Sequence, residues 1–292
     1  MLVLLGVTLV TFGMLFITGD PAVLLAPEDA SREDVERIRR DMGFDRPWPV
    51  QYVDYLGRAA TGDFGVSYRA RQPVFDLVLE RVPATFQLAA AALFIACIVA
   101  IPAGVIAAVR RGTKYDYLAQ FIAMTGQAIP AFWLGLMLML IFAVNLRWLP
   151  VSGYGDWRYL ILPAVSLAMA PMALMMRMVR SSVLEILNKD YIRTARAKGL
   201  AGQVVIARHA LRNALIPVVT VIGLELGSLV SGTVVIESIF AWPGLGRLVL
   251  SSIYGKDIPV VMAGLILIAL FYVTINFLVD IVYVVLDPRI RY

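Results

Sequence analysis

This chain of 292 residues has few of the side chains that form metal sites, catalytic triads or disulfides. His209 is the single histidine and Cys97 the single cysteine, so we expect no His/Cys metal site, no Ser-His-Asp triad and no intrachain disulfide. Cys97 lies in an apolar run and is expected to be a small buried hydrophobe. No Gly-x-x-x-x-Gly-Lys-Ser/Thr sequence is present, so no phosphate-binding loop for ATP is expected. The sequence therefore predicts a protein that is not an enzyme and holds neither a metal nor a cofactor of its own.

Polar side chains within apolar runs are the next candidates for a functional role. Glu225 is costly in hydrocarbon, so it should face a bundle interior or water. It could contact a cationic group of a substrate or make a structural hydrogen bond, and the sequence leaves both open. Asn276 and Asp280, one helical turn apart, have the same alternatives, and Glu237 is expected at an outer boundary.

Three small residues precede and follow Glu225 at helical spacing. Gly223, Gly227 and Ser231 stand at i, i+4 and i+8, a pattern that permits close approach of two helices. It fits packing within this chain and packing against a second membrane subunit beside a transport pathway equally well.

The stretch 190–217 combines positive charge with helical periodicity. Its apolar residues at helical spacing are Leu200, Val204, Ala207, Leu211 and Leu215. Arg208 and Arg212 lie on another face, and Gly199 and Gly202 should break the stretch into two short helices. Such a basic element could lie on anionic lipid headgroups or dock into a cleft of a partner protein, and charge alone does not decide.

The elements that position these residues are apolar. The chain is 60% hydrophobic and 16% charged, against about 25% charged in ordinary soluble domains. A bilayer core of about 30 Å needs about 20 apolar residues of helix. Six stretches qualify, at about residues 1–18, 84–109, 117–146, 159–179, 214–236 and 258–286. We therefore expect an all-α membrane protein with six transmembrane helices.

Loop charge predicts the orientation. Segment 110–114 holds three basic residues, and 177–212 holds eight basic residues against two acids. Segment 19–83 carries twelve acids and nine bases. Because cytoplasmic loops are enriched in Lys and Arg, the basic loops and the tail 287–292 should be cytoplasmic and 19–83 extracytoplasmic. An even number of spans then places the N-terminus in the cytoplasm as well.

The first span begins at Met1 with no basic residue before it. A signal peptide is disfavoured, because neither a basic n-region nor an Ala-x-Ala-like cleavage site is visible. We expect the natural start to lie upstream, with a basic extension that this sequence lacks.

The outward segment is patterned. Ser31 should cap a charged helix over 32–42, with Asp34 in the place of the capping-box acid, and a second helix is expected over 52–60. A small extracytoplasmic cap packed on the first spans is favoured over a ligand site of its own.

The basic loop resembles a known family. Residues 190–200 read Asp-Tyr-Ile-Arg-Thr-Ala-Arg-Ala-Lys-Gly-Leu, which is similar to the peptide branch of ABC importer permeases. Gly199 matches the glycine of their Glu-Ala-Ala loop, and Arg193-Thr194-Ala195 stands where that triplet would be. Other stretches that resemble the family are 20–22, 44–47, 50–52, 62–68, 81–85, 129–135, 148–153, 237–246 and 287–292. The resemblance covers almost the whole chain and is greatest to the first of the two paired dipeptide/oligopeptide permease subunits.

The resemblance implies a type I importer permease with an extracytoplasmic insertion between helices 1 and 2. The expected parts are a first transmembrane helix (1–18), an extracytoplasmic segment (19–83), a five-helix core (84–286) that includes a cytoplasmic coupling loop (180–212), and a cytoplasmic tail (287–292). The residues it implies for ATPase coupling are Asp190, Tyr191, Arg193, Thr194, Ala195, Lys198, Gly199 and Leu200.

It also implies partners. These are a second homologous permease, two ABC ATPases that hold ATP and Mg²⁺, an extracytoplasmic substrate-binding protein and membrane lipid, without nucleic acid. In related importers a loop after the fifth span meets the binding protein, so Trp242, Pro243, Gly244 and Leu245 are expected at that contact or at an outer gate. A plain interfacial tryptophan anchor is the alternative.

Two other functions stay open. Sister permeases of the same architecture carry glutathione, nickel chelates or other small solutes, and the spans do not distinguish these substrates. A secondary transporter that works alone is the alternative from another class.

Overall fold

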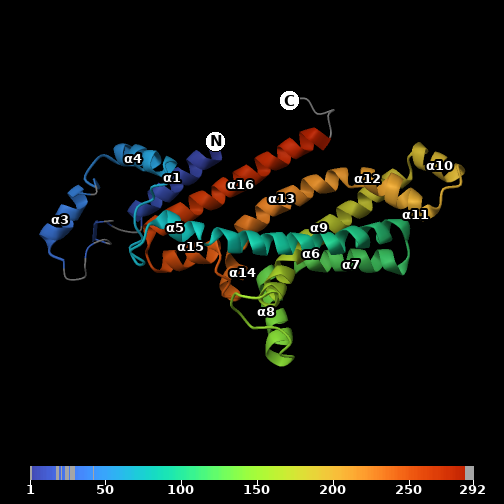
Figure 1. Ribbon diagram of the computed structural model, residues 1–292, viewed down its shortest axis with the longest axis horizontal. Coiled ribbons are helices and arrows are strands. Elements are labelled where there is room, and N and C mark those ends of the chain that lie inside the picture. The colour runs from blue at the N-terminus through green and yellow to red at the C-terminus, as the bar shows by residue number, and fades with distance from the viewer. Residues whose placement is uncertain are drawn as a thin grey trace. The chain divides into compact units, whose positions relative to one another are not determined.

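The computed structural model describes residues 2–17, 20, 22–23, 26, 30–41 and 43–286. These residues form helices and loops, with one isolated β-bridge and no named strand among them, so the expected all-α fold is confirmed (Figure 1). The chain divides into two compact units, Met1–Thr85 with Pro243–Val273 and Phe86–Trp242 with Thr274–Tyr292. Each unit is described by itself.

The first unit contains most of the outward segment. Its helices are α1 (Leu2–Ile17), α3 (Arg32–Asp41), α4 (Trp48–Ala60), α5 (Val74–Leu79), the start of α6 (Val82–Val109), α15 (Leu245–Tyr254) and the first part of α16 (Ile258–Leu286). The Asp34 N–H donates to Ser31 Oγ at 3.2 Å and the Ser31 N–H donates to the Asp34 carboxylate at 3.2 Å, which is the expected capping box. The Ser31 hydroxyl and N–H hold the pKa of Asp34 below its usual value. Helix α4 begins at Trp48, earlier than expected, because Pro49 fits the first turn of a helix.

Helix α4 packs on two apolar helices of its unit. Tyr55 of α4 joins Phe12 of α1, with Ile258 and Met262 of α16, in one buried cluster. The rings of Phe12 and Tyr55 stack at 5.8 Å. A second cluster joins α5, α15 and α16. These contacts show the segment packed on the first apolar helix, and its extracytoplasmic location stays a prediction.

A buried carboxylate fixes the loop that precedes α5. Asp257, 3% exposed, accepts hydrogen bonds from the Ser67 hydroxyl, the Tyr68 N–H at 3.1 Å and the Arg69 N–H at 3.4 Å. Ser67 Oγ in turn accepts from the Ala70 N–H at 2.9 Å. One side chain therefore satisfies donors of a loop 190 residues away in the sequence.

Replacing Asp257 by alanine is expected to release this loop. Buried donors without an acceptor cost about 1–3 kcal/mol, so the amide hydrogens of Tyr68 and Arg69 should exchange at least about tenfold faster. Asp257→Asn keeps a carbonyl acceptor and should lose less, while Asp76→Ala, at an exposed acid of α5, should change nothing. Hydrogen-exchange mass spectrometry of the purified protein measures these rates. Equal exchange in Asp257→Ala and Asp76→Ala would refute the anchoring role.

The second unit holds the remaining apolar helices. They are the rest of α6, α7 (Lys114–Ala128), α8 (Ala131–Leu138), the π-helix η1 (Met139–Asn145), α9 (Trp157–Leu187), α10 (Asp190–Ala197), α11 (Gly202–Val204), the π-helix η2 (Val205–Ala210), α12 (Leu211–Ala214), α13 (Ile216–Gly232), α14 (Val234–Ile239) and the rest of α16. In Figure 1, α10 and α11 lie at the same end of α9.

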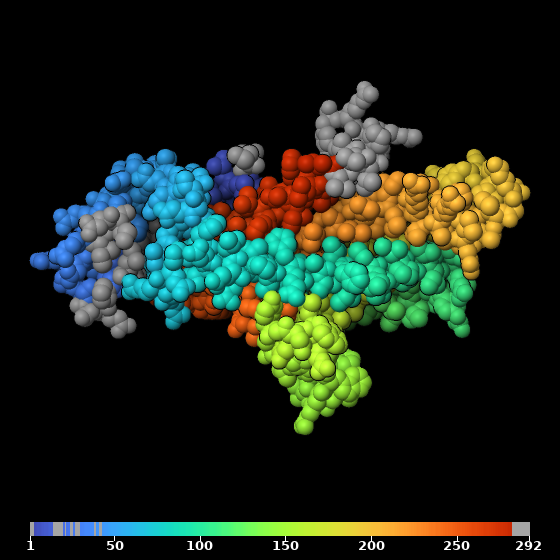
Figure 2. Space-filling view, viewed as in Figure 1, coloured from blue at the N-terminus to red at the C-terminus, as the bar shows by residue number. Residues whose placement is uncertain are grey.

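The expected span 117–146 is broken rather than continuous, and a second break lies at the start of the expected span 214–236. Helices α7 and α8–η1 meet at 102°, because Pro130 restricts Ile129 to an extended conformation that ends α7. In Figure 2 the yellow-green segment of α8 and η1 projects from its unit. The helices on either side of Leu215, before Pro217, meet at 52°.

Length and composition support part of the expected span count. Within the described residues three helices are long and apolar enough to cross a membrane, or up to five if each bent pair is one span. Helix α1, with 16 residues, is shorter than these. Six spans therefore stay a prediction, and the tail 287–292 lies outside the described residues.

A buried ion pair ties α7 to α9. Asp116 accepts from Arg180 Nε at 2.6 Å and Nη2 at 2.9 Å, a bidentate geometry. The same carboxylate accepts from the Gly112 N–H at 3.0 Å and from Gln120 Nε2 at 2.9 Å. Asp116 is 3% exposed, so four donors compensate for its removal from water.

Candidate coupling loop and translocation residues

The basic loop folds into a short helical hairpin. Helix α10 ends at a Schellman motif, in which the Gly199 N–H donates to Arg196 O at 2.9 Å and the Leu200 N–H donates to Ala195 O at 3.4 Å. Gly199 has φ +78°, a left-handed conformation that glycine adopts without strain. Helix α11 then starts at Gly202, so the expected break into two short helices is present.

One face of the hairpin is anchored in the chain. Ile192 and Ala195 of α10 cluster with Val205 and Ala210 of η2, and all four are buried. Among the predicted coupling residues Ala195 alone belongs to this anchor. The exposed predicted residues are Asp190, Tyr191, Arg193, Thr194, Lys198, Gly199 and Leu200.

The predicted apolar stripe of the second helix was wrong at three of its five positions, whereas Leu211 and Leu215 are partly buried. Leu200, Val204 and Ala207 are exposed, whereas the buried residues are Val205, Ala210 and Ala214. Their spacing of five and then four residues follows from η2, because a π-helix closes hydrogen bonds over five residues. The stripe assumed a continuous α-helix.

Polar contacts fix the two arms of the hairpin to each other. Asn213 Nδ2 donates to the Tyr191 hydroxyl at 3.1 Å and to His209 O at 3.0 Å. Arg193 lies 3.5 Å from the Asp190 carboxylate, an exposed pair of small energetic weight. The loop thus has a defined shape before any partner binds.

The outer surface of the hairpin is cationic. Its exposed basic side chains are Arg193, Arg196, Lys198, Arg208 and Arg212. Only Arg193 among them forms an ion pair within the described part of the chain. An ordered helix with an apolar anchor on one side and free cations on the other is suited to contact with a protein partner or an anionic surface.

Gly223 of the small-residue stripe lies against the same chain. A Cβ at Gly223 would stand 2.2 Å from Cγ2 of Val279 in α16. Gly227 is buried, and the Ser231 hydroxyl donates to Ser228 O at 3.0 Å and to Gly227 O at 3.3 Å. At Gly223 the stripe thus serves packing within this subunit.

Gly223→Val is expected to destabilise the subunit by about 1–3 kcal/mol, because the added methyl groups overlap Val279. Gly232→Val, on the same helix with nothing within 4 Å of its Cβ, is the matched control. Thermal unfolding in detergent, followed by thiol labelling of the half-buried Cys97, compares them. If Gly223→Val unfolds like the control and instead loses a co-purifying second subunit, the contact between subunits is the correct interpretation.

The polar residues of the apolar helices differ in exposure. Glu225 is half-buried and makes no hydrogen bond or ion pair with a described residue. Asn276 Oδ1 is buried without a partner among the described residues, whereas Asp280 is exposed. Glu237, expected at a boundary, is fully buried and accepts a hydrogen bond from the Thr233 hydroxyl at 2.9 Å. A pathway role for Glu225 and Asp280 stays a prediction.

The residues proposed for the outer loop are mostly inaccessible. Trp242, Gly244 and Leu245 are buried and Pro243 is partly exposed. The Trp242 ring stands edge-on to Tyr154 at 4.8 Å, and the Leu245 N–H donates to Thr85 Oγ1 at 2.8 Å. Trp242 and Leu245 are thus buried in this conformation, and both the contact with a binding protein and the outer-gate role stay predictions.

Sequence reasoning missed the residues that depend on long-range pairing. Asp116 and Arg180 are 64 positions apart, and no local pattern links them. Ile192 had a usable signal, since it stands three residues before Ala195 on the buried side of a short charged helix. Within the described residues no cluster of three or more His, Cys, Asp or Glu side chains could hold a metal ion.

Comparison of sequences with protein families gives two matches. Residues 100–292 match the binding-protein-dependent transport system inner membrane component, and residues 1–89 match the N-terminal component of the same system. Together they span nearly all of the chain.

Curated relatives match over nearly their full length. The dipeptide transport system permease protein DppB of Alkalihalophilus pseudofirmus is 40% identical over 99% of this chain and 96% of its own. DppB of Escherichia coli K12 is also 40% identical, over 99% of this chain and 95% of its own. The glutathione transport system permease protein GsiC of the same strain is 42% identical over 94% of this chain and 90% of its own.

Solved structures support the fold. The inward-facing MetNI methionine ABC transporter aligns with a TM-score of 0.61 at 22% identity, covering 72% of this chain and 96% of that one. An amino acid ABC transporter aligns with a TM-score of 0.53 at 14% identity, covering 74% and 94%. The chain therefore has the type I importer permease fold that its motifs implied. It is a multi-pass inner-membrane permease, not an enzyme, and belongs to the family of binding-protein-dependent transport system inner membrane components.

Proposed function

We propose that this permease forms half of a translocation pathway for di- and oligopeptides and is driven through the loop 190–212 by ATPase subunits. The helical hairpin carries the coupling part of this proposal, because its buried face is fixed by Ile192, Ala195, Val205 and Ala210 while its cations stay exposed. The 40% sequence identity to dipeptide permeases, over 99% of this chain, supports the substrate part.

Two ABC ATPases bind the hairpins of this subunit and of a second permease. They hold ATP and Mg²⁺, and their closure moves the docked hairpins. ATP can bias the pathway only if the loop contacts the closed and open ATPase dimers with different free energies. An extracytoplasmic binding protein delivers substrate, and the basic loops and both termini face the cytoplasm.

Glutathione is the second candidate substrate. Sequence similarity supports this candidate, because the glutathione transport permease GsiC is about as similar to this chain as the dipeptide permeases are. Glutathione is itself a tripeptide, so the two candidates share the chemistry of a charged peptide.

Transport by the reconstituted complex tests the proposal. The permease is co-purified with its partners, placed in liposomes, and supplied with binding protein outside and ATP inside. We expect uptake of radiolabelled alanyl-phenylalanine that requires ATP. Uptake of glutathione alone would replace the peptide assignment, and substrate movement by the isolated chain along an ion gradient would overturn the importer mechanism.

A further inference from the structure

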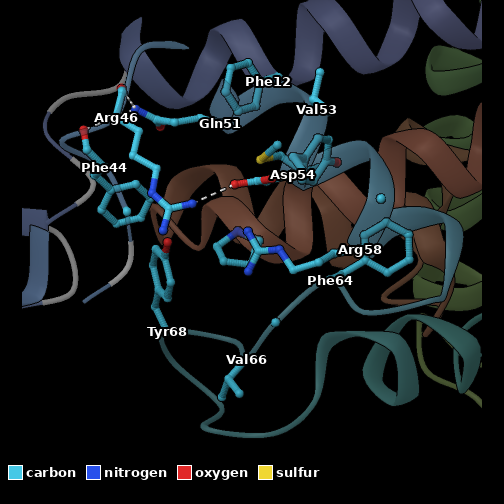
Figure 3. A pocket seen from close by; sticks show the side chains of 16 residues that line it. Phe12, Phe44, Arg46, Gln51, Val53, Asp54, Arg58, Phe64, Val66 and Tyr68 are labelled. Atoms are coloured by element: carbon cyan, nitrogen blue, oxygen red, sulfur yellow. Dashed lines mark hydrogen bonds and ion pairs between the residues drawn. The ribbon is translucent and has the colours of Figure 1, made fainter. Parts of the chain in front are cut away.

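A pocket of about 880 Å³ lies within the first unit, beside α4. Its walls come from the turn around Arg46, from α4 and from the loop that ends at Tyr68, and its base reaches Phe12 of α1 and Met262 of α16 (Figure 3). Small-molecule sites have volumes of about 300–1,000 Å³, so the space is large enough for a short peptide.

The base of the pocket is apolar and buried. Phe12, Tyr55 and Met262 are 3%, 8% and 6% exposed and belong to one core cluster. Gln51 Nε2 donates to Phe44 O at 3.1 Å and to Arg46 O at 2.7 Å, which fixes the neighbouring wall to α4. The base is therefore a formed apolar surface that could cover a nonpolar side chain.

The rim carries charges of both signs. Arg46 and Asp54 are paired at 3.1 Å with 59% and 51% of their side chains exposed. Arg58, one turn after Asp54 on α4, is exposed and makes no ion pair with a described residue. One guanidinium at the rim thus has no carboxylate partner in the described part of the chain.

Tyr68 adds a neutral donor to the wall. Burial, with the nearby Asp257 charge, raises the pKa of Tyr68 to about 12. Its hydroxyl therefore keeps its proton at neutral pH and can donate a hydrogen bond. Figure 3 shows Arg46, Arg58 and Tyr68 directed toward the same space.

The distribution of charge selects the kind of ligand. The exposed side chains of the lining are those of the charged Arg46, Asp54 and Arg58 and of the apolar Val53 and Val66. A lipid acyl chain would cover the three charges without pairing them, which is costly. A water-borne molecule with an apolar part and two charged ends fits both the base and the rim.

We propose that this pocket is a peptide-binding site on the outward segment of the permease, formed by residues other than the candidate pathway residues. It takes a short peptide with free ends, the carboxylate at Arg58, the ammonium at Asp54 and an apolar side chain against Phe12 and Met262. The site would hold a peptide at the outer face of the permease. This inference rests on the proposed import of peptides.

Photocrosslinking to the assembled complex, without binding protein, tests the site. The probe is alanyl-p-benzoylphenylalanine, and mass spectrometry maps the attachment. We expect labelling at Phe12, at Met262 or within residues 43–68 that alanyl-phenylalanine competes away. Its C-terminal amide should compete at least about tenfold less well, because a charge-assisted hydrogen bond is lost.

Two variants locate the ligand. Arg58→Gln removes the free guanidinium and should reduce labelling about tenfold, whereas Arg32→Gln, at an exposed arginine of α3 outside the pocket, should not. Gly57→Leu should also block labelling, because it fills the pocket from a position where a Cβ meets nothing within 4 Å. Leucine is a better helix former than glycine, so this variant should remain folded.

Several outcomes would overturn the inference. They are labelling only at residues other than Phe12, Met262 and 43–68, equal competition by the amide, unchanged labelling in Arg58→Gln and Gly57→Leu, or labelling that phosphatidylglycerol in nanodiscs suppresses while the peptide does not. Uptake measured in parallel separates the two proposals. Normal peptide uptake without pocket labelling refutes the site alone, and absence of peptide uptake refutes the peptide assignment.

Discussion

Replacing Asp116 by alanine should destabilise the permease by about 3–5 kcal/mol, because it leaves the partly buried Arg180 without its carboxylate. The Gly112 N–H and Gln120 Nε2 would lose an acceptor at the same time. Thermal unfolding in detergent, followed by labelling of Cys97 with a thiol-reactive fluorophore, reports the loss.

Two comparisons make this prediction specific. Glu185→Ala breaks an exposed pair with Lys189 at 3.0 Å and should cost less than about 1 kcal/mol. The double variant Asp116→Leu/Arg180→Met removes both charges and should recover most of the stability, since a buried pair is about as stable as a nonpolar replacement. A double variant as unstable as Asp116→Ala would show that the ion pair is not the cause.

Reversing two charges of the coupling loop should nearly abolish transport while the permease stays folded. Arg193 and Lys198 are exposed, and neither contacts the buried anchor of the hairpin. Arg193→Glu/Lys198→Glu should therefore leave thermal unfolding unchanged but reduce ATP-driven uptake in proteoliposomes by about tenfold or more, the range of an interprotein coupling energy.

The other basic loop provides a control. Arg111→Glu/Lys114→Glu makes the same change in net charge at exposed positions of the 110–114 loop. We expect this variant to retain most uptake. Equal losses in both double variants would mean that net cytoplasmic charge, not the hairpin, controls transport.

Local pattern was sufficient to predict the helical elements and the position of the loop. Apolar runs gave α6, α9 and α16, and the conformational freedom of Gly199 predicted the end of α10. The break at Pro130 was missed because a proline within an apolar run is compatible with both a continuous and a broken membrane helix.

The candidate site was predictable only where its contacts are local. The loop sequence marked the exposed residues of α10, but not Val205 and Ala210, whose burial depends on η2. Trp242 was expected near a surface and is buried against Tyr154, a neighbour 88 positions earlier. The pathway residues, the partners and the orientation stay predictions.

The π-helix η2 also determines how this loop tolerates insertions and deletions. It holds one residue more per turn than an α-helix, so it is equivalent to a single-residue insertion. A π-helix uses the extra residue to complete the same turn, so removing one residue between 205 and 210 would restore α-helical geometry and leave the cations before it on nearly the same side relative to Ala214. A one-residue gap within these six residues would therefore preserve the docking surface, whereas a one-residue gap in the α-helical residues 211–214 would rotate that surface by about 100° relative to α13.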